Sequence, residues 1–423
     1  MSANDVQIAR RTSNPAARSL VRSVLAKTKL YWGLAALIAF GALTSPLSSK
    51  GSNIFLSVGN LTDILRQVSV TGIVAVGMTV VIFTAGIDLS VGSIMALGTV
   101  ICAMLLTQEG WSAATYFGVP ATGLTLFIGI FFVLSLILTA FQQKGADQAA
   151  QETSESGNAT LTIGAGLIAA LIAGLAMMWL AGQAGSKFGV LAVLLCVPCV
   201  GAVMGSVSGA LIVHGRLQPF IVTLAMMVGA LGLARVIAGQ DTAVHPVYTG
   251  SNATEHFEIL RSLLWGVLPV PGIIFVAVLL IVYFVVRFTT FGSYVLAIGG
   301  NEEASRLAGI NVQRVKIATY SLAGALSALA GILYVAQFRQ GKPDAGLGLE
   351  LDAIAAVVIG GTSLAGGKGK IVWTVGGVLF LVVIDMSLKL LGMSLFVVFA
   401  VKGAVILLAA IIDAMRQRII MRS

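Results

Sequence analysis

Residues 287–316, RFTTFGSYVLAIGGNEEASRLAGINVQRVK, form a polar stretch that glycine residues interrupt. Apolar runs border this stretch on both sides, at 276–286 and 317–335. Within it, EEASRL at 302–307 favours a short helix, which Asn301 caps and Gly309 ends. A short helix held between two membrane spans is a segment that another protein could push. The stretch therefore predicts an all-α membrane protein that a separate polypeptide drives.

The composition agrees with this class of protein. Hydrophobic residues make up 57% of the chain and charged residues only 10%, which is typical of a polytopic transmembrane helical bundle and excludes a soluble core. Glycine accounts for 49 of the 423 residues, as expected where helices approach one another closely in lipid. The apolar runs predict spans at 31–47, 61–86, 89–107, 121–141, 163–182, 190–213, 220–238, 271–287, 315–336, 351–363, 371–390 and 396–413.

Basic residues predict how these spans are oriented. The predicted segments on one side of the membrane hold 17 of the 26 Lys and Arg residues, whereas those on the other side hold five. Because basic residues concentrate in the cytoplasm, both chain termini and the 287–316 loop are expected there. The net charge of +9 is thus a signal of topology and does not indicate nucleic acid. The predicted organisation is a basic segment at 1–30, a transmembrane domain at 31–413 and a basic tail at 414–423.

Two predicted spans are interrupted, one in each half of the chain. The run at 351–363 is too short to cross ~30 Å of hydrocarbon as a helix, and AGIDLSVGS at 85–93 breaks another span, with Asp88 at the expected N-cap of the next helix. Paired interruptions of this kind indicate two pseudo-repeated halves that line a path. Capping alone would explain Asp88, and hydroxyls often bond their own helix backbone, so both interpretations stay open. The residues expected near the path are Asp88, Ser90, Ser93, Gly360, Gly361, Thr362 and Ser363.

Five stretches carry a resemblance to a known family. They are AGIDLSVGS at 85–93, HGRLQPFIVTLAMM at 214–227, GGNEEASRLAGINV at 299–312, ELDAIAAVVIGGTSLAGGKGKIV at 350–372 and VKGAVILLAAIID at 401–413. Together they resemble the ribose-type sugar permeases of ATP-binding-cassette importers. The resemblance implies a pair of permease subunits in lipid, a cytosolic ATPase subunit and an extracytoplasmic sugar-binding protein. It also assigns contact with the ATPase to Gly300, Asn301, Glu302, Glu303, Ala304, Arg306, Leu307 and Gly309.

The chain departs from this family in its number of spans. The family usually has about ten, and the surplus here lies between residues 108 and 189, where the flexible linker 142–162 joins two apolar runs. The expected architecture is therefore about ten core spans plus an inserted two-span helical hairpin.

The sequence contains no motor and no catalytic centre of its own. No GxxxxGK[ST] phosphate cradle occurs, and neither an HExxH nor a GxSxG motif is present. We therefore expect a permease without enzymatic activity, catalytic residues, cofactor or metal, located in a bacterial inner membrane and carrying ribose or a related pentose or hexose. Whether the second permease copy is identical is left open.

An ion-driven secondary transporter is the alternative function. It would need ionisable groups within the spans, and the chain offers few. Asp385 and Lys389 are spaced to neutralise each other on one helix face, and Lys402 is expected to snorkel or to pair with a neighbouring span. Asp352 sits near a span end. These residues do not form the chain of carboxylates that a proton relay needs.

Overall fold

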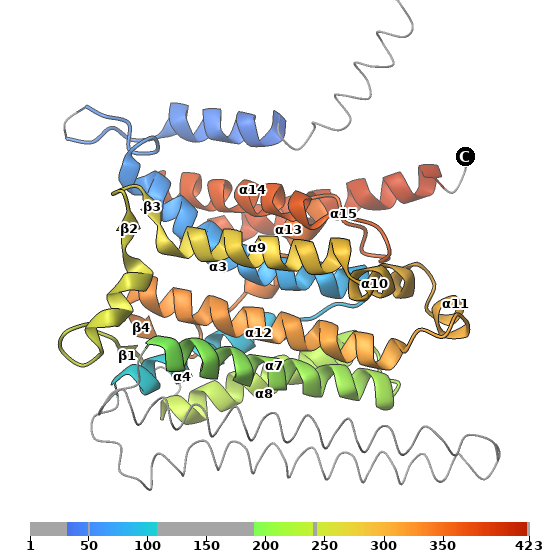
Figure 1. The fold of residues 1–423 in the computed structure, drawn as a ribbon. Coiled ribbons are helices and arrows are strands. Elements are labelled where there is room, and N and C mark those ends of the chain that lie inside the picture. The colour runs from blue at the N-terminus through green and yellow to red at the C-terminus, as the bar shows by residue number, and fades with distance from the viewer. Residues whose placement is uncertain (1–31, 50, 108–189, 240–242, 421–423) are drawn as a thin grey trace, which may run out of the picture.

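The computed structural model describes residues 32–49, 51–107, 190–239 and 243–420, and these form a bundle of helices (Figure 1). A first helix, Trp32–Thr44, precedes the labelled elements. The labelled helices are α3 (Val58–Phe83), α4 (Val91–Thr107), α7 (Val190–His214), α8 (Pro219–Ala238), η1 (Glu255–Arg261), α9 (Val270–Phe288), α10 (Thr290–Gly300), α11 (Glu302–Leu307), α12 (Val312–Phe338), α13 (Leu349–Ile359), α14 (Ile371–Leu390) and α15 (Leu395–Ile420). The strands are two-residue pieces, β1 (His245–Pro246), β2 (Leu263–Leu264), β3 (Leu268–Pro269) and β4 (Gln340–Gly341).

Helices α3 and α12 form the centre of the bundle and run in opposite directions. Most of the apolar window of α3 is buried, as is the greater part of that of α12. Their side chains dominate the main hydrophobic core, which includes Ile73, Val76, Leu326 and Leu333. Figure 1 shows the pairs β1–β4 and β2–β3 together with η1 at one end of the bundle and α11 at the other. We call these the strand end and the α11 end.

The contacts of the central helices reveal two pseudo-repeated halves. The first half consists of α3, α4, α7 and α8, and the second consists of α12, α13, α14 and α15. Helix α12 packs against α4 and α7 of the first half, and α3 packs against α13 and α14 of the second. This exchange of contacts between two antiparallel central helices agrees with the predicted pseudo-repeated halves, an organisation in which interrupted helices are common in the membrane.

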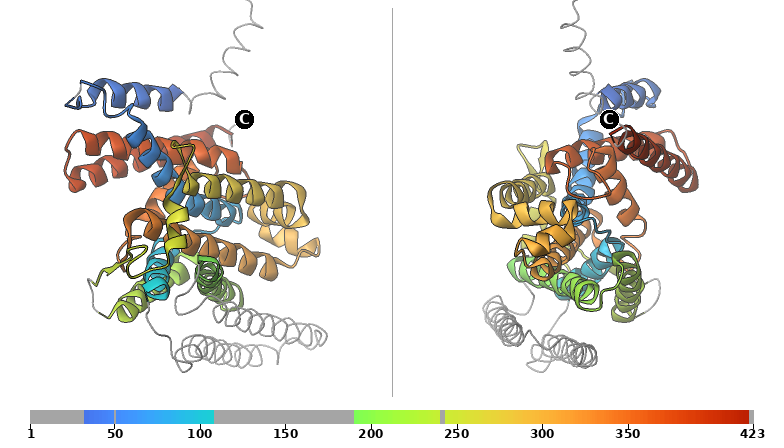
Figure 2. Two further views of the ribbon diagram at one scale, coloured as in Figure 1. Left: turned by 60° about the vertical axis from the view of Figure 1, so that its left-hand side comes forward. Right: turned by 90° about the vertical axis from the view of Figure 1, so that its right-hand side faces the viewer.

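The outer helices present apolar surface. Along α8, Phe220, Val228 and Val236 are exposed, and along α9, Leu280 and Phe284 are exposed. Such all-round apolar helices are stable where lipid replaces water. Figure 2 shows the first helix and α15 on one side of the bundle, with α7 and α8 on the opposite side.

The predicted spans agree closely with the helices that the structure describes. Within the described residues, six helices are long and apolar enough to cross a membrane, and α4, the first helix and Phe396–Leu408 of α15 are shorter apolar segments. The two spans predicted at 121–141 and 163–182, the 142–162 linker and the segment 1–30 lie outside the described residues. The total of about ten core spans therefore stays a prediction, as do the domain limits.

One helix was not predicted. The polar 287–316 stretch contains α10 as well as α11, because α9 ends at Phe288 and α10 begins at Thr290, with only Thr289 between them. Gly292 permits this tight junction, since a Cβ on it would overlap the Val286 carbonyl. Gly292 thus allows close packing between two helices and does not mark an irregular loop.

Candidate functional site: a surface helix and two interrupted spans

Helix α11 forms as the sequence predicts. The Asn301 side chain accepts a hydrogen bond from the Ala304 N–H at 2.9 Å, which satisfies one of the free donors at a helix start. At the other end, Gly309 has φ of +83° and its N–H donates to the Arg306 carbonyl. Only glycine adopts this left-handed conformation without strain. The predicted N-cap and the predicted C-terminal stop are both confirmed.

Most of the residues that the resemblance assigns to ATPase contact are on the surface. Glu302 is half-buried, and Leu307 is 83% exposed. The remaining assigned residues are exposed as well; they are Gly300, Asn301, Glu303, Ala304, Arg306 and Gly309. This end of the bundle therefore offers a compact helix with charged and apolar side chains on its outer face.

Helix α11 is also tied to the bundle by an ion pair. The Nζ of Lys316, on the first turns of α12, lies 2.6 Å from Oε2 of Glu302. Arg306 approaches the other carboxylate oxygen of Glu302 at 3.7 Å. Because α12 continues from this point to the strand end, a displacement of α11 would act directly on a central helix.

A second connection runs through Gly299, at the end of α10. A Cβ on Gly299 would overlap the backbone of both Phe83 and Gly367. The Gly367 N–H donates to the Phe83 carbonyl at 3.0 Å. The end of α10, the end of α3 and the glycine-rich loop after α13 therefore meet backbone to backbone. The residues next to α11 are thus in contact with both interruptions that the sequence predicts.

The interruption between α3 and α4 spans residues 84–90, which contain no helix. Asp88 is fully buried, and its Oδ1 accepts hydrogen bonds from the Ser90 N–H at 2.9 Å and from the Ser90 hydroxyl at 2.6 Å. The expectation that Asp88 is the N-cap of α4 is wrong. Ser90 takes that place, since its carbonyl accepts the first helical bond from Ile94. Asp88 lies two residues before this N-cap, and its side chain closes a local turn by accepting the two hydrogen bonds from Ser90.

Two buried polar atoms beside this interruption have no hydrogen-bond partner among the described residues: Oδ2 of Asp88 and the Tyr320 hydroxyl. Tyr320 belongs to α12, and its hydroxyl lies over Gly86. Buried polar atoms of this kind normally bond water or another polar group. The interruption is therefore polar at the centre of an apolar bundle.

The second interruption lies around α13, which has 11 residues and is about 16 Å long at the usual rise of 1.5 Å per residue. Gly360 packs against the backbone of Trp373, and Gly361 has φ of +93°. Thr362 is buried with an unpartnered hydroxyl, and Ser363 receives a hydrogen bond from the Ala365 N–H. A Cβ on Gly369 would meet both Thr362 and the ring of Phe83, so Thr362 lies close to the end of α3.

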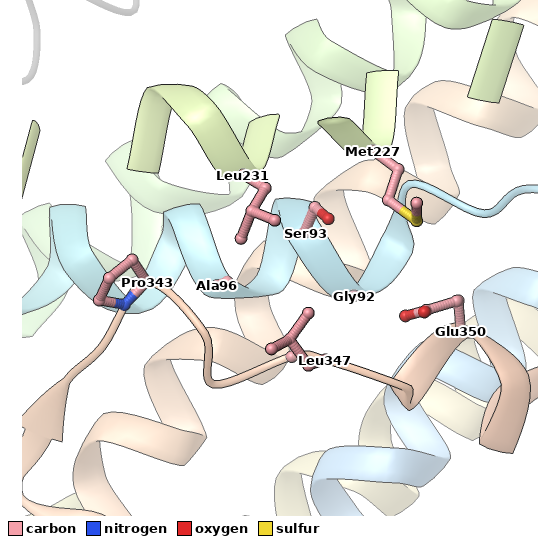
Figure 3. A pocket seen from close by; sticks show the side chains of 9 residues that line it. Gly92, Ser93, Ala96, Met227, Leu231, Pro343, Leu347 and Glu350 are labelled. Atoms are coloured by element: carbon pink, nitrogen blue, oxygen red, sulfur yellow. The ribbon is translucent and has the colours of Figure 1, made fainter. Parts of the chain in front are cut away.

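Ser93 belongs to a different part of the site. It lines a cavity of about 90 Å³ between α4, α8 and the chain that leads into α13 (Figure 3). Asp88, Ser90 and the segment 360–363 do not line this cavity. The predicted path residues therefore fall into two groups, one at the two interruptions and one, Ser93, at the cavity.

Glu350 also lines the cavity, and our sequence analysis did not single it out. The available signal was its position immediately before the short predicted span 351–363 and two residues after Gly348. A carboxylate at such an interrupted helix is costly in lipid and marks a functional position.

A cluster of charges holds α13 in place. The Nζ of Lys402, on α15, lies 2.9 Å from Asp352 on α13 and 3.2 Å from Asp385 on α14. Lys389 pairs with Asp385 on the same face of α14 at 2.5 Å. The predicted pairing of Asp385 with Lys389 is confirmed, and so is the pairing of Lys402 with a neighbouring span. Two carboxylates and two ammonium groups neutralise one another here, which is a different arrangement from a chain of carboxylates for proton transfer.

Metal binding finds no support in the described part of the chain. No group of three or more His, Cys, Asp or Glu side chains there is arranged to hold a metal ion.

Comparison with known proteins identifies the class to which this fold and site belong. The chain belongs to the family described as branched-chain amino acid transport system / permease component, which matches residues 60–410. It is a multi-pass membrane protein of this permease family.

Particular relatives are ribose and xylose permeases by name. The chain is 37% identical over 388 residues to the ribose import permease protein RbsC of Escherichia coli (strain K12), covering 91% of this chain and 93% of that protein. It is 34% identical over 391 residues to RbsC of Bacillus subtilis (strain 168), covering 92% and 93%. It is 33% identical over 383 residues to the xylose transport system permease protein XylH of Escherichia coli (strain K12), covering 86% and 87%. No solved structure matches the chain.

Proposed function

We propose that this chain is the membrane-spanning subunit of an ATP-binding-cassette importer that carries ribose or a related pentose or hexose. A binding protein would deliver the sugar at the strand end, and a separate ATPase would act at the α11 end. Two permease subunits would enclose the path. The observation that carries the proposal is the short capped helix α11, which combines an exposed outer face with backbone contacts to both interruptions through α10.

The mechanism follows from these contacts. Closure of the ATPase pair would displace α11, and the Glu302–Lys316 ion pair would pass the displacement to α12. At the same time, Gly299 would press on the ends of α3 and of the loop 360–370. Because both interrupted segments meet at this point, one push would tilt both halves, and the path between two subunits would change its open side.

The orientation of the chain belongs to the same proposal. The α11 end would face the cytoplasm, with both termini on that side. Of the two basic residues in the loop 364–370, Lys370 lies over the ring of Trp373. Basic residues at this end agree with the distribution that membrane insertion favours.

Uptake of labelled ribose into proteoliposomes tests the proposal. The vesicles would contain this subunit, its ATPase and its binding protein, and ionophores would abolish ion gradients. We expect uptake that requires ATP and the binding protein and that ionophores do not change. Uptake by this chain alone that ionophores abolish would instead identify an ion-driven secondary transporter.

Variants on the outer face of α11 test the coupling role. We expect Glu303→Lys combined with Leu307→Asp to reduce ATP-driven uptake at least about tenfold, since loss of an interface hot spot costs about 2 kcal/mol or more and about 1.4 kcal/mol corresponds to a factor of ten. Leu280→Ala, at an exposed position in the middle of α9 and away from both ends of the bundle, is the control and should leave the rate unchanged. Size-exclusion profiles would verify that both proteins fold. Uptake by the α11 variant at the parent rate would contradict the assignment.

A charge reversal that includes Glu302 tests both the outer face of α11 and its ion pair with α12. Glu302→Lys with Glu303→Lys and Arg306→Glu also removes the carboxylate that faces Lys316. We expect ATP hydrolysis to continue without sugar uptake in this variant, because α11 would no longer transmit its movement to α12.

A further inference from the structure

The cavity beside Ser93 lies where the two interrupted helices begin. Gly92, at the start of α4, approaches Gly346 so closely that a Cβ on either would overlap the backbone of the other. Glu350, in the first turn of α13, places a carboxylate oxygen against Gly92. Figure 3 shows Glu350 pointing toward the start of α4, where Ser93 lies in the same first turn as Gly92. The starts of one helix from each half therefore share one small space.

The remaining walls of the cavity are apolar. Met227 and Leu231 come from α8, and Pro343 and Leu347 come from the chain before α13 (Figure 3). Sites for small molecules are commonly built in this way, with apolar walls and a few polar groups that fix orientation. A volume of about 90 Å³ exceeds the need of a single water molecule several times over.

We propose that this cavity is a subsite for a neutral polyhydroxylated ligand, with Glu350 as the group that determines specificity. The carboxylate of Glu350 would accept hydrogen bonds from hydroxyl groups of the sugar ring, and Ser93 would bond a third hydroxyl. The C–H face of the ring would pack on Met227 and Leu231. This inference rests on the proposed function, because it names the place in the path at which the carried sugar is recognised.

The charges around the cavity favour a neutral ligand. Glu350 is the only ionisable residue among those that line it. Asp352 of the same helix faces Lys402, so the two carboxylates of the first turn serve different purposes. An anionic solute would meet the Glu350 carboxylate without a compensating cation, whereas a hydroxyl donor gains a charge-assisted hydrogen bond.

A helix-capping role for Glu350 has to be separated from recognition. A carboxylate in the first turn stabilises a helix through the macrodipole. Loss of that capping role would lower the uptake rate of every sugar by the same factor. Recognition instead predicts that the loss depends on which hydroxyls the sugar carries. The ratio of uptake rates for ribose and its deoxy analogues therefore distinguishes the two roles, because the same binding protein and ATPase serve every variant.

The experiment compares Glu350→Gln, Ser93→Ala and the parent in the assembled transporter. We expect Glu350→Gln to reduce ribose uptake about tenfold, the equivalent of one charge-assisted hydrogen bond, and to affect at least one deoxyribose much less. Gly229→Ala, at an exposed α8 position with open space around it, is the control and should keep both rate and ratio. An equal loss for every sugar would overturn the proposal and leave Glu350 as a structural cap.

A second measurement does not depend on transport. Leu347→Cys would be introduced after Cys102, Cys196 and Cys199 are replaced by alanine, and its alkylation by N-ethylmaleimide would be timed with and without millimolar ribose. Slower alkylation of Leu347→Cys in the presence of ribose, lost when Glu350→Gln is added, would support the subsite. Alkylation of Leu347→Cys that ribose does not slow, with Glu350 intact, would overturn it. Failure of the parent to take up sugar with ATP would instead contradict the proposed function, so the two failures are distinguishable.

Discussion

Two interfaces within the bundle hold helices together by opposite means. Helix α7 meets α12 through Gly201, Gly205 and Gly209, which repeat every four residues on one face. A Cβ on Gly205 would overlap the Tyr320 carbonyl, so the two backbones touch. In contrast, α13, α14 and α15 are joined by the long side chain of Lys402, which reaches two carboxylates.

The difference concerns how much movement each interface tolerates. Lipid supplies no hydrophobic driving force between helices, so close backbone packing of small residues gives strong association with little freedom to slide. A lysine side chain keeps its partners over a range of positions because its four-carbon stem is flexible. The α7–α12 contact therefore acts as a fixed frame. Helix α13 also meets α14 closely, since a Cβ on Gly377 would overlap the Ala356 carbonyl. The link between α13 and α15, in contrast, depends on the Lys402 side chain.

The largest effect is expected from filling the glycine interface. Gly205→Leu forces α7 and α12 apart, and overpacking costs about 1–3 kcal/mol and occasionally more; this site lies at the upper end, because the Cβ itself would overlap the Tyr320 carbonyl. We expect loss of monodisperse protein in detergent, measured by size-exclusion chromatography and by thermal unfolding.

Gly229→Leu is the matched control for Gly205→Leu. It introduces the same side chain on α8 at a glycine with nothing within 4 Å, so yield and unfolding temperature should stay near the parent values. A Gly205→Leu protein that unfolds at the parent temperature would show that α7 and α12 are not in backbone contact.

The interface around Lys402 should respond differently to substitution, because a second substitution can restore the stability that the loss of Lys402 removes. Lys402→Met leaves Asp352 and Asp385 with Lys389 alone, and breaking a buried pair from one side costs about 3–5 kcal/mol. Adding Asp352→Asn removes the uncompensated carboxylate, while Asp385 keeps Lys389 at 2.5 Å. We expect the double variant to unfold at a higher temperature than Lys402→Met alone.

A double-mutant cycle measures this rescue as a coupling energy. Asp352→Asn alone supplies the fourth corner of the cycle. Additive effects of the two substitutions would mean that Lys402 and Asp352 are not paired, and α13 would then be held by apolar contacts only.

The same contrast explains which features the sequence could predict. Local rules gave the Asn301 cap, the Gly309 stop and the i, i+4 pair of Asp385 and Lys389, because each depends on residues within one or two turns. The limits of α14, Ile371–Leu390, agree with the prediction residue for residue, since lipid selects length and apolarity directly.

The sequence analysis missed features that depend on contacts between distant residues, or predicted them only in part. The alternatives for Lys402 included pairing, but nothing in the sequence selects Asp352, which is 50 residues away, as its partner. Asp88 was predicted to cap α4 because it precedes an apolar helix. The helix begins two residues later than that prediction requires, so Ser90 is its N-cap. The position of Glu350 at the cavity became evident only from the fold, which places the start of α13 beside Gly92.

The smallest effect is expected for an ion pair in water. At the strand end, Glu258 accepts hydrogen bonds from Arg339 at 3.1 Å and from Thr249 at 2.8 Å, and its side chain is 43% exposed. Exposed pairs contribute about 0–1 kcal/mol, so Glu258→Gln should lower the unfolding temperature only slightly at neutral pH. Lys402→Met should be several times more damaging, although both variants remove one partner of an Asp or Glu ion pair.

The pH dependence sharpens this last comparison. Partial burial, the largest single influence, raises the pKa of Glu258, but the hydrogen bonds from Thr249 and Arg339 and the charges of Arg339 and Arg261 together lower it. A folded-state pKa below the unfolded value means that the stabilisation is present above the unfolded pKa of about 4.3 and disappears as the pH falls through the folded pKa. The difference in unfolding temperature between the parent and Glu258→Gln should therefore shrink as the pH is lowered from 7 toward 3. A difference that stays constant over this range would show that Glu258 acts through packing and not through its charge.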